Sequence, residues 1–135
     1  MGKQPEAQLS ENITKALKKE AKKRGHELFI FKVHGHDQQM SGVPDLLACY
    51  RGRFIGLEVK MPGNHPSPRQ IYVMDRIAWA GGIVLVPYSV SEALDCLDLV
   101  DGLIDGPKVL QSKSGPCKTG AQHGYIGRLP DCQHD

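Results

Sequence analysis

One segment of the chain, residues 41–60, constrains the fold more than any other because it contains two short apolar runs separated by an Arg-Gly pair. The runs cover residues 45–50 and 54–59, and glycine or proline bounds each of them. Short aliphatic runs joined by two turn residues are typical of a β-hairpin. We therefore predict two antiparallel strands with Arg51 and Gly52 as the turn.

This turn fixes which residues of the two strands face each other. It places Asp45 opposite Glu58, on the same face of the sheet and about 4.5–5.5 Å apart at Cβ. Lys60 lies two residues beyond Glu58, so it points to that face as well. The sequence therefore predicts that two carboxylates and one amine converge beside apolar strands.

Such a group of charges suits a divalent cation. Two carboxylates buried close together are costly unless a cation lies between them. Mg²⁺ binds one or two carboxylates and keeps waters that phosphate oxygens can replace. Lys60 would orient or activate a water, or stabilise charge on phosphorus. The geometry predicts metal-assisted phosphodiester hydrolysis, and the alternative is a structural salt bridge between Lys60 and one of the acids.

The spacing of Pro44-Asp45, twelve further residues and Glu58-Val59-Lys60 resembles the PD-(D/E)xK nuclease superfamily. A longer series of motifs over residues 6–95 resembles its VRR-NUC family, in the small stand-alone form. That series comprises Lys32-Val33-His34-Gly35, Gly42-Val43-Pro44-Asp45, Gly52-Arg53-Phe54, Glu58-Val59-Lys60, Gln70 and Ala80-Gly81-Gly82. The resemblance implies an α/β fold with a restriction-endonuclease-like core, in which helices flank a mixed central sheet.

The resemblance also implies roles for individual residues. Catalytic roles fall to Asp45, Glu58, Lys60 and Gln70. Mg²⁺ or Mn²⁺ would be held by Glu6, Asp45, Glu58 and the carbonyl of Val59. Contacts with nucleic acid are expected from Lys32, His34 and Arg69. The expected partner is DNA, in particular branched DNA such as Holliday junctions, and stand-alone members of the family are thought to form homodimers.

The first helix, expected over residues 5–24, raises the question of which acid it supplies to the site. Its apolar stripe also carries Glu6 and Glu20, although an unpaired glutamate is seldom buried. Nucleases of this superfamily often take one metal-binding acid from the first helix, and the spacing of Glu6 from the apolar residues fits. We expect Glu6, with Glu20 as the alternative. The stripe consists of Leu9, Ile13, Ala16, Leu17 and Ala21.

The remaining periodicity predicts a strand at 27–33, a helix at 68–80, a strand at 83–87 and a final helix that ends near Leu99. Ser67 and Gln70 have the spacing of a capping box, so Gln70 has a structural alternative to its catalytic role. The inward residues of the 68–80 helix are expected to be Ile71, Met74, Ile77 and Ala78. Residues 5–100 would form the nuclease-like domain, and residues 101–135 a flexible or irregular tail.

Composition limits the other possibilities. The net charge is only +2, so local clusters must attract DNA. The basic face formed by Lys15, Lys18, Lys19 and Lys22 has two interpretations, a phosphate-binding surface or a solvated one. No apolar run is long enough to cross a membrane, no secretory signal is present, and four unpatterned cysteines suit a reducing cytoplasm.

Two further hypotheses follow from the sequence. The first is a non-catalytic DNA-binding module that keeps the nuclease fold. The second is an interaction protein that binds zinc through Cys117, His123, Cys132 and His134, although their spacing is irregular. A metal site at His34, His36 and Asp37 lacks a further local ligand.

Overall fold

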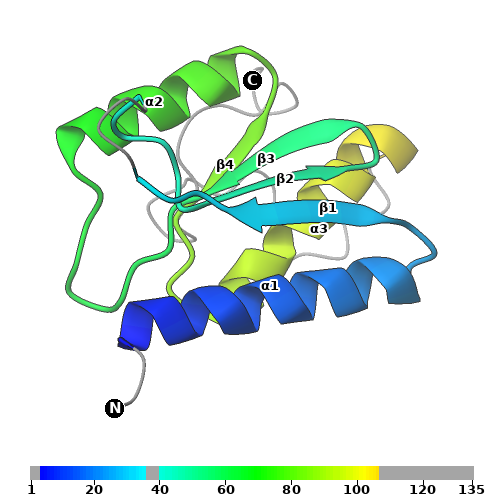
Figure 1. Cartoon of the computed structure of the whole chain (residues 1–135). Helices are drawn as coiled ribbons and strands as arrows, with labels where there is room; N and C mark the ends of the chain where they lie inside the picture. The colour runs from blue at the N-terminus through cyan, green and yellow to red at the C-terminus, as the bar shows by residue number, and fades with distance from the viewer. Residues whose placement is uncertain (1–3, 36–39, 107–135) are drawn as a thin grey trace.

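The computed structural model describes residues 4–35 and 40–106, in which a four-stranded mixed sheet has helices on both faces (Figure 1). The strands lie in the order β1-β2-β3-β4, with the first three antiparallel and β3 parallel to β4. They comprise β1 (Leu28–Lys32), β2 (Leu46–Tyr50), β3 (Arg53–Leu57) and β4 (Ile83–Leu85). The helices comprise α1 (Pro5–Lys23), α2 (Pro68–Trp79) and α3 (Val90–Asp105). The predicted α/β class with a mixed sheet is confirmed.

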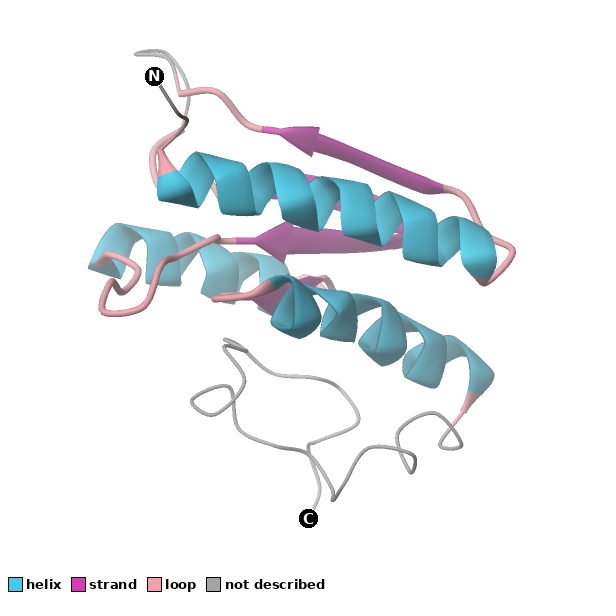
Figure 2. Ribbon diagram, turned by 90° about the horizontal axis from the view of Figure 1, so that it is seen from below, coloured by secondary structure: helices cyan, strands magenta, loops and turns pink. Residues whose placement is uncertain are grey.

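Two unequal cores lie on either side of the sheet. Helices α1 and α3 lie side by side against one face, and α2 covers part of the other (Figure 2). The main core lies beneath α1 and α3, where Ile13 and Leu17 of α1 meet Ile55, Leu57 and other fully buried residues. The smaller core joins α2 to β4 and its continuation, and consists of Met74, Ala78, Val84 and Val86. The described helices therefore cover one face of the sheet more completely than the other.

The hairpin between β2 and β3 has the predicted register. Tyr50 pairs with Arg53 and Leu46 pairs with Leu57. Both turn residues have positive φ, 52° at Arg51 and 81° at Gly52, as a type I′ turn requires. A positive φ is uncommon for arginine, but the Arg51 guanidinium is held by ion pairs with two aspartates of α3. The two-residue turn therefore sets the register that extends toward Asp45 and Glu58.

The helices differ from the predictions in two places. Ile71 is exposed rather than inward, because the buried side of α2 is turned toward Val73. Helix α3, which Ser89 caps, continues past Leu99 to Asp105. Its extension includes Asp101, an acid on the buried face whose partners lie on other elements. The tail residues proposed for zinc, and His36 and Asp37, lie outside the described residues.

Candidate active site

The predicted catalytic residues meet at the end of the sheet opposite the hairpin turn. Both helices α1 and α2 begin at this end, on the left in Figure 1. Asp45 precedes β2, and its carbonyl accepts a hydrogen bond from the Val33 N–H at 2.8 Å. Glu58 follows β3, and its N–H donates to the Leu85 carbonyl at 3.0 Å. Hydrogen bonds to neighbouring strands thus hold the backbone of both acidic residues.

Glu58 is the most buried charged residue of this site, with 1% of its surface exposed. Its Oε2 accepts a hydrogen bond from Nε2 of Gln70 at 2.7 Å and lies 3.4 Å from Nζ of Lys60. Its Oε1 is buried and has no hydrogen-bond partner among the described residues. Burial raises the pKa of Glu58 to about 7, and the charge of Asp45 adds to the shift while Lys60 opposes it. The carboxylate therefore lacks a compensating positive group on one side.

Asp45 faces the same space from the adjacent strand. Its Oδ2 accepts a hydrogen bond from the backbone N–H of Val59 at 3.0 Å. Burial raises the pKa of Asp45, whereas this hydrogen bond and the charge of Lys32 lower it. Val59 itself is fully buried, and the side chain of Lys60 is only 16% exposed. The structure thus brings together the two acids, Val59 and Lys60, and Gln70 joins them through Glu58.

The two glutamates of α1 lie in different environments. The charge of Glu6 raises the pKa values of both Asp45 and Glu58, so Glu6 lies near the site at the first turn of α1. Glu20 instead pairs with Arg24 at 2.9 Å. That pair belongs to a cluster at the hairpin end of the sheet, away from the site. Of the two candidates, Glu6 is the one whose charge affects the pKa values of Asp45 and Glu58.

The start of α2 is tied to Glu58 by one side chain. Ser67 Oγ accepts a hydrogen bond from the Gln70 N–H, and Gln70 Oε1 accepts one from the Ser67 N–H, which together form the predicted capping box. The Nε2 of the same Gln70 donates to Glu58. The structural and the site interpretations of Gln70 therefore hold simultaneously.

The residues expected to contact nucleic acid surround this site. Lys32 and His34 are exposed where β1 ends, and Lys32 is near enough to lower the pKa of Asp45. Arg69 is exposed beside Gln70, and its Nε donates to the Ser41 carbonyl at 3.3 Å. Gly42 has a φ of +86°, and a Cβ there would lie 2.8 Å from Cγ of Arg69. The loop before Asp45 is therefore packed closely against the start of α2.

The donor chemistry of the site fits a hard divalent cation. Two adjacent carboxyls have raised pKa values, and a buried carboxylate oxygen has no hydrogen-bond partner within residues 4–35 and 40–106. Such oxygens are the ligands that Mg²⁺ and Mn²⁺ prefer, with waters in the remaining positions. Among the described residues, no three His, Cys, Asp or Glu side chains gather closely enough to hold a metal ion by themselves. Backbone oxygen and water would therefore have to complete the coordination.

The fold of this chain is similar to a fold already seen in a solved structure. One solved structure, described as a VRR_NUC domain, is similar to this chain at 26% sequence identity with a TM-score of 0.50. The match covers 65% of this chain and 92% of the other. The fold matches that of a VRR_NUC domain. The similarity to a VRR_NUC domain, with its PD-(D/E)xK-like core, indicates a nuclease.

Other comparisons add nothing to the VRR_NUC match. No family model matches the sequence, and no curated protein is significantly similar to it.

In the part of the chain that the structure describes, no helix is sufficiently long and apolar to cross a membrane.

A charged cluster that the sequence did not predict lies at the opposite end of this VRR_NUC-like fold. Asp101 accepts hydrogen bonds from Arg24 at 3.0 Å, from Arg51 at 2.7 Å and from the Tyr50 hydroxyl at 3.1 Å. Burial and the Asp101 hydrogen bond raise the pKa of Tyr50 to about 12. The available signal was the position of Asp101 four residues after Leu97, on the apolar stripe of its helix.

Proposed function

We propose that this protein is a divalent-metal-dependent DNA endonuclease that hydrolyses phosphodiester bonds. The observation that carries the proposal is the environment of Glu58. This carboxylate is almost completely buried and lies beside Asp45, Lys60 and Gln70, and its Oε1 finds no hydrogen-bond partner in the part of the chain that the structure describes. Burying this carboxylate is costly even with Lys60 and Gln70 beside Oε2, and a cation that binds at Oε1 would lower the cost. Such an arrangement suits a site built for an ion rather than for stability.

Asp45, Glu58 and the Val59 carbonyl would hold Mg²⁺ or Mn²⁺, with Glu6 acting directly or through a water. When bound, the ion polarises the phosphate and lowers the pKa of a bound water. The protein contributes the fixed positions of the two acids. The Val59 N–H keeps Asp45 in place, and Gln70 keeps Glu58 in place.

Lys60 would act on the attacking water or on the phosphate. Its ammonium group lies 3.4 Å from Oε2 of Glu58, which holds it at the site. From there it can donate a hydrogen bond to a water or to a phosphate oxygen, and stabilise negative charge in the transition state. Lys32, His34 and Arg69 would contact the backbone of the DNA around the scissile phosphate.

A cleavage assay tests the proposal. The protein is incubated with labelled linear, flap and four-way DNAs, with and without Mn²⁺ or Mg²⁺. We expect metal-dependent cleavage that Lys60→Ala abolishes, with DNA binding largely retained. Lys23→Ala, an exposed lysine at the end of α1 and outside its basic face, is the matched control and should cut normally. Undiminished cleavage by Lys60→Ala would refute the assignment.

We further propose that the substrate is branched DNA and that the protein acts as a homodimer. Two sites related by a two-fold axis suit paired cuts in a symmetric junction. The phenylalanine face, which we define as Phe29, Phe31, Leu47, Cys49 and Phe54, supports a second copy as partner. It lies on the side of the sheet that α2 leaves partly uncovered, and its side chains pair across β1, β2 and β3.

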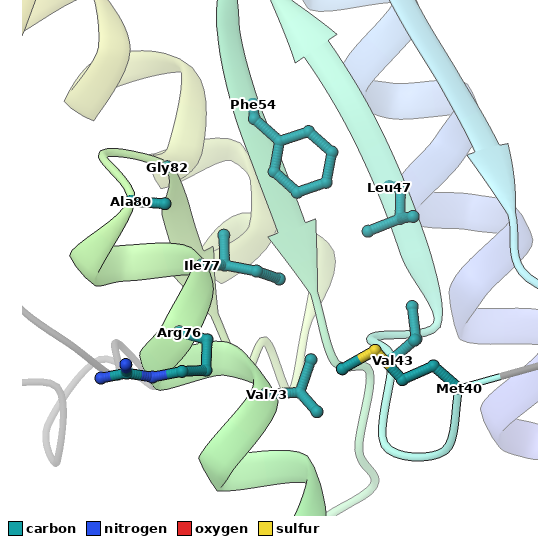
Figure 3. Close-up of a pocket in the computed structure, with 9 residues that line it drawn as sticks. All are labelled: Met40, Val43, Leu47, Phe54, Val73, Arg76, Ile77, Ala80 and Gly82. Atoms are coloured by element: carbon teal, nitrogen blue, oxygen red, sulfur yellow. The ribbon is translucent and has the colours of Figure 1, made fainter.

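This face is both apolar and hollowed. Its three phenylalanines, which are all that the chain contains, are 64%, 47% and 45% exposed. A hollow of about 430 Å³ opens between Leu47, Phe54 and α2. Figure 3 shows the side chains that line it. Monomeric proteins rarely expose contiguous apolar patches of large size. An uncharged surface can meet its own copy without charge repulsion.

The alternative function is a DNA-binding module without catalysis. Asp45, Glu58 and Lys60 are all present and adjacent, which favours the enzyme. DNA binding that ignores Mg²⁺ and Mn²⁺, without nicking of any DNA form, would favour the module instead.

A further inference from the structure

The exposed side of α2 carries an unusual group of three side chains directly beyond the active site. Cζ of Arg69 lies 5.4 Å from the centre of the Tyr72 ring, and Cζ of Arg76 lies 5.8 Å from it. Both distances are within the range of cation–π interaction. All three residues are exposed. A single tyrosine therefore holds two guanidinium groups at the surface.

Their spacing forms a strip along the helix. Residues at i, i+3 and i+7 lie on one side of an α-helix. Seven residues correspond to about 10 Å of helix length. The strip begins at Arg69, the neighbour of Gln70, so it leads away from Glu58 along α2.

Two features prepare these guanidinium groups for a ligand. Stacking on a ring occupies the face of a guanidinium and leaves its N–H edge free to donate. Arg69 is held further by its bond to the Ser41 carbonyl. Fixed guanidinium groups recognise phosphate oxygens in paired hydrogen bonds and lose less entropy on binding.

One acid competes with this role. Asp75 Oδ2 lies 3.6 Å from Nη2 of Arg76, and both side chains are about half exposed. An exposed ion pair of this length contributes little, so a DNA phosphate can replace it.

We propose that Arg69, Tyr72 and Arg76 form a phosphate clamp that holds the DNA backbone next to the scissile phosphate. The clamp rests on the proposed nuclease function and adds Tyr72 and Arg76 to its DNA-binding surface. Because DNA rises about 3.4 Å per nucleotide of one strand, the strip spans about three nucleotides. The contacts go to phosphates and are independent of base sequence.

Binding measured without cleavage tests the clamp. Fluorescence anisotropy with labelled duplex and four-way DNA, in EDTA, gives the slope of log affinity against log salt concentration. We expect the combined variant Arg69→Ala, Arg76→Ala to reduce this slope by about 2, which corresponds to two lost phosphate contacts. Arg53→Ala, beside the hairpin turn at the other end of the sheet, is the control and should leave the slope unchanged. A wild-type slope in the combined variant, with its fold intact by circular dichroism, would overturn the clamp.

Variants of Tyr72 separate stacking from charge. Tyr72→Leu should weaken binding although no charge is lost, and Tyr72→Phe should bind as the wild type does, because its ring still stacks. Equal binding by all three proteins would contradict the clamp.

Failure of the clamp and failure of the nuclease function give different results. If the wild type cuts DNA with Mn²⁺ but the combined variant keeps the wild-type salt-dependence slope, only the clamp is refuted. If the wild type never cuts DNA but the combined variant has a smaller salt-dependence slope, the clamp is supported and the nuclease function is refuted.

Discussion

The carboxylate of Glu58 is almost completely buried, and its Oε1 has no hydrogen-bond partner among the described residues. Its pKa rises from an ordinary 4.5 to about 7 in the folded protein, chiefly through burial. Between these two values the folded state binds more protons than the unfolded state. Without metal, the contribution of Glu58 to stability is therefore fully present below about pH 4.5 and is lost as the pH rises to about 7. Asp45, whose pKa is also raised, contributes with the same sign.

The first prediction concerns Glu58→Gln, which removes this charge while keeping the shape. In EDTA, the free energy of unfolding of the wild type should fall by up to about 3 kcal/mol from the Glu58 contribution between pH 4.5 and pH 8. The variant should lack that part of the decline and should be the more stable protein at pH 8. Urea unfolding at pH 4.5 and pH 8 measures both. Equal pH dependence in the two proteins would contradict the assigned environment.

At the level of the element, α2 shows how one residue can serve both folding and the site. Gln70 closes the capping box with Ser67 and donates to Glu58. Ser67 takes part in the cap alone. Substitution of these two residues therefore separates the two roles.

The second prediction follows from that comparison. Ser67→Ala and Gln70→Ala should each destabilise the protein by about 1 kcal/mol through the lost cap. Gln70→Ala should in addition reduce metal-dependent cleavage, because Glu58 loses the hydrogen bond that orients it. Thermal unfolding and cleavage rates measured on both variants provide the test. Equal cleavage by the two variants would leave Gln70 with the structural role alone.

The hairpin turn is fastened to α1 and α3 by Asp101, which is 8% exposed. A third prediction is that Asp101→Ala destabilises the fold by about 3 kcal/mol, because Arg24, Arg51 and the buried Tyr50 hydroxyl lose their common acceptor. Asp105→Ala, which removes a half-exposed partner of Arg51, should cost less than about 1 kcal/mol. Urea unfolding of the two variants checks the difference. Similar losses would contradict a central role of Asp101.

The elements differ in how much of them could be predicted from sequence. The hairpin register and the capping box depend on residues that are close in the chain, so spacing was sufficient to predict both. The buried Asp101 depends on Arg24 and Arg51, which are distant in sequence, so periodicity alone placed the end of α3 too early. The exposed position of Ile71 likewise depends on where α2 lies across the sheet.

For the whole molecule, the uneven cover of the sheet is the main feature that the sequence did not indicate. The two acids and Lys60 were predicted to converge because one turn length fixes their register. All three phenylalanines are exposed because α2 packs against β4 and leaves the same face of β1, β2 and β3 partly uncovered. No local sequence pattern encodes where α2 packs.

The fourth prediction belongs to this scale. If the phenylalanine face joins two copies, the combined variant Phe29→Ser, Phe31→Ser should sediment as a monomer while the wild type sediments as a dimer. Ile104→Ser, an exposed apolar residue of α3, is the control and should remain dimeric. A monomeric wild type, or a dimeric double variant, would refute the proposed interface.

The two-residue connection at Arg51 and Gly52 has a consequence for how this protein can vary. Side chains alternate between the two faces of a strand, so one inserted residue that shifted the pairing would turn Glu58 away from Asp45. Natural relatives with the same chemistry should therefore conserve the length of this connection, far from the reacting phosphate, more strictly than the length of the loop at 61–67. Deletion and insertion libraries of the two segments would reveal this asymmetry directly.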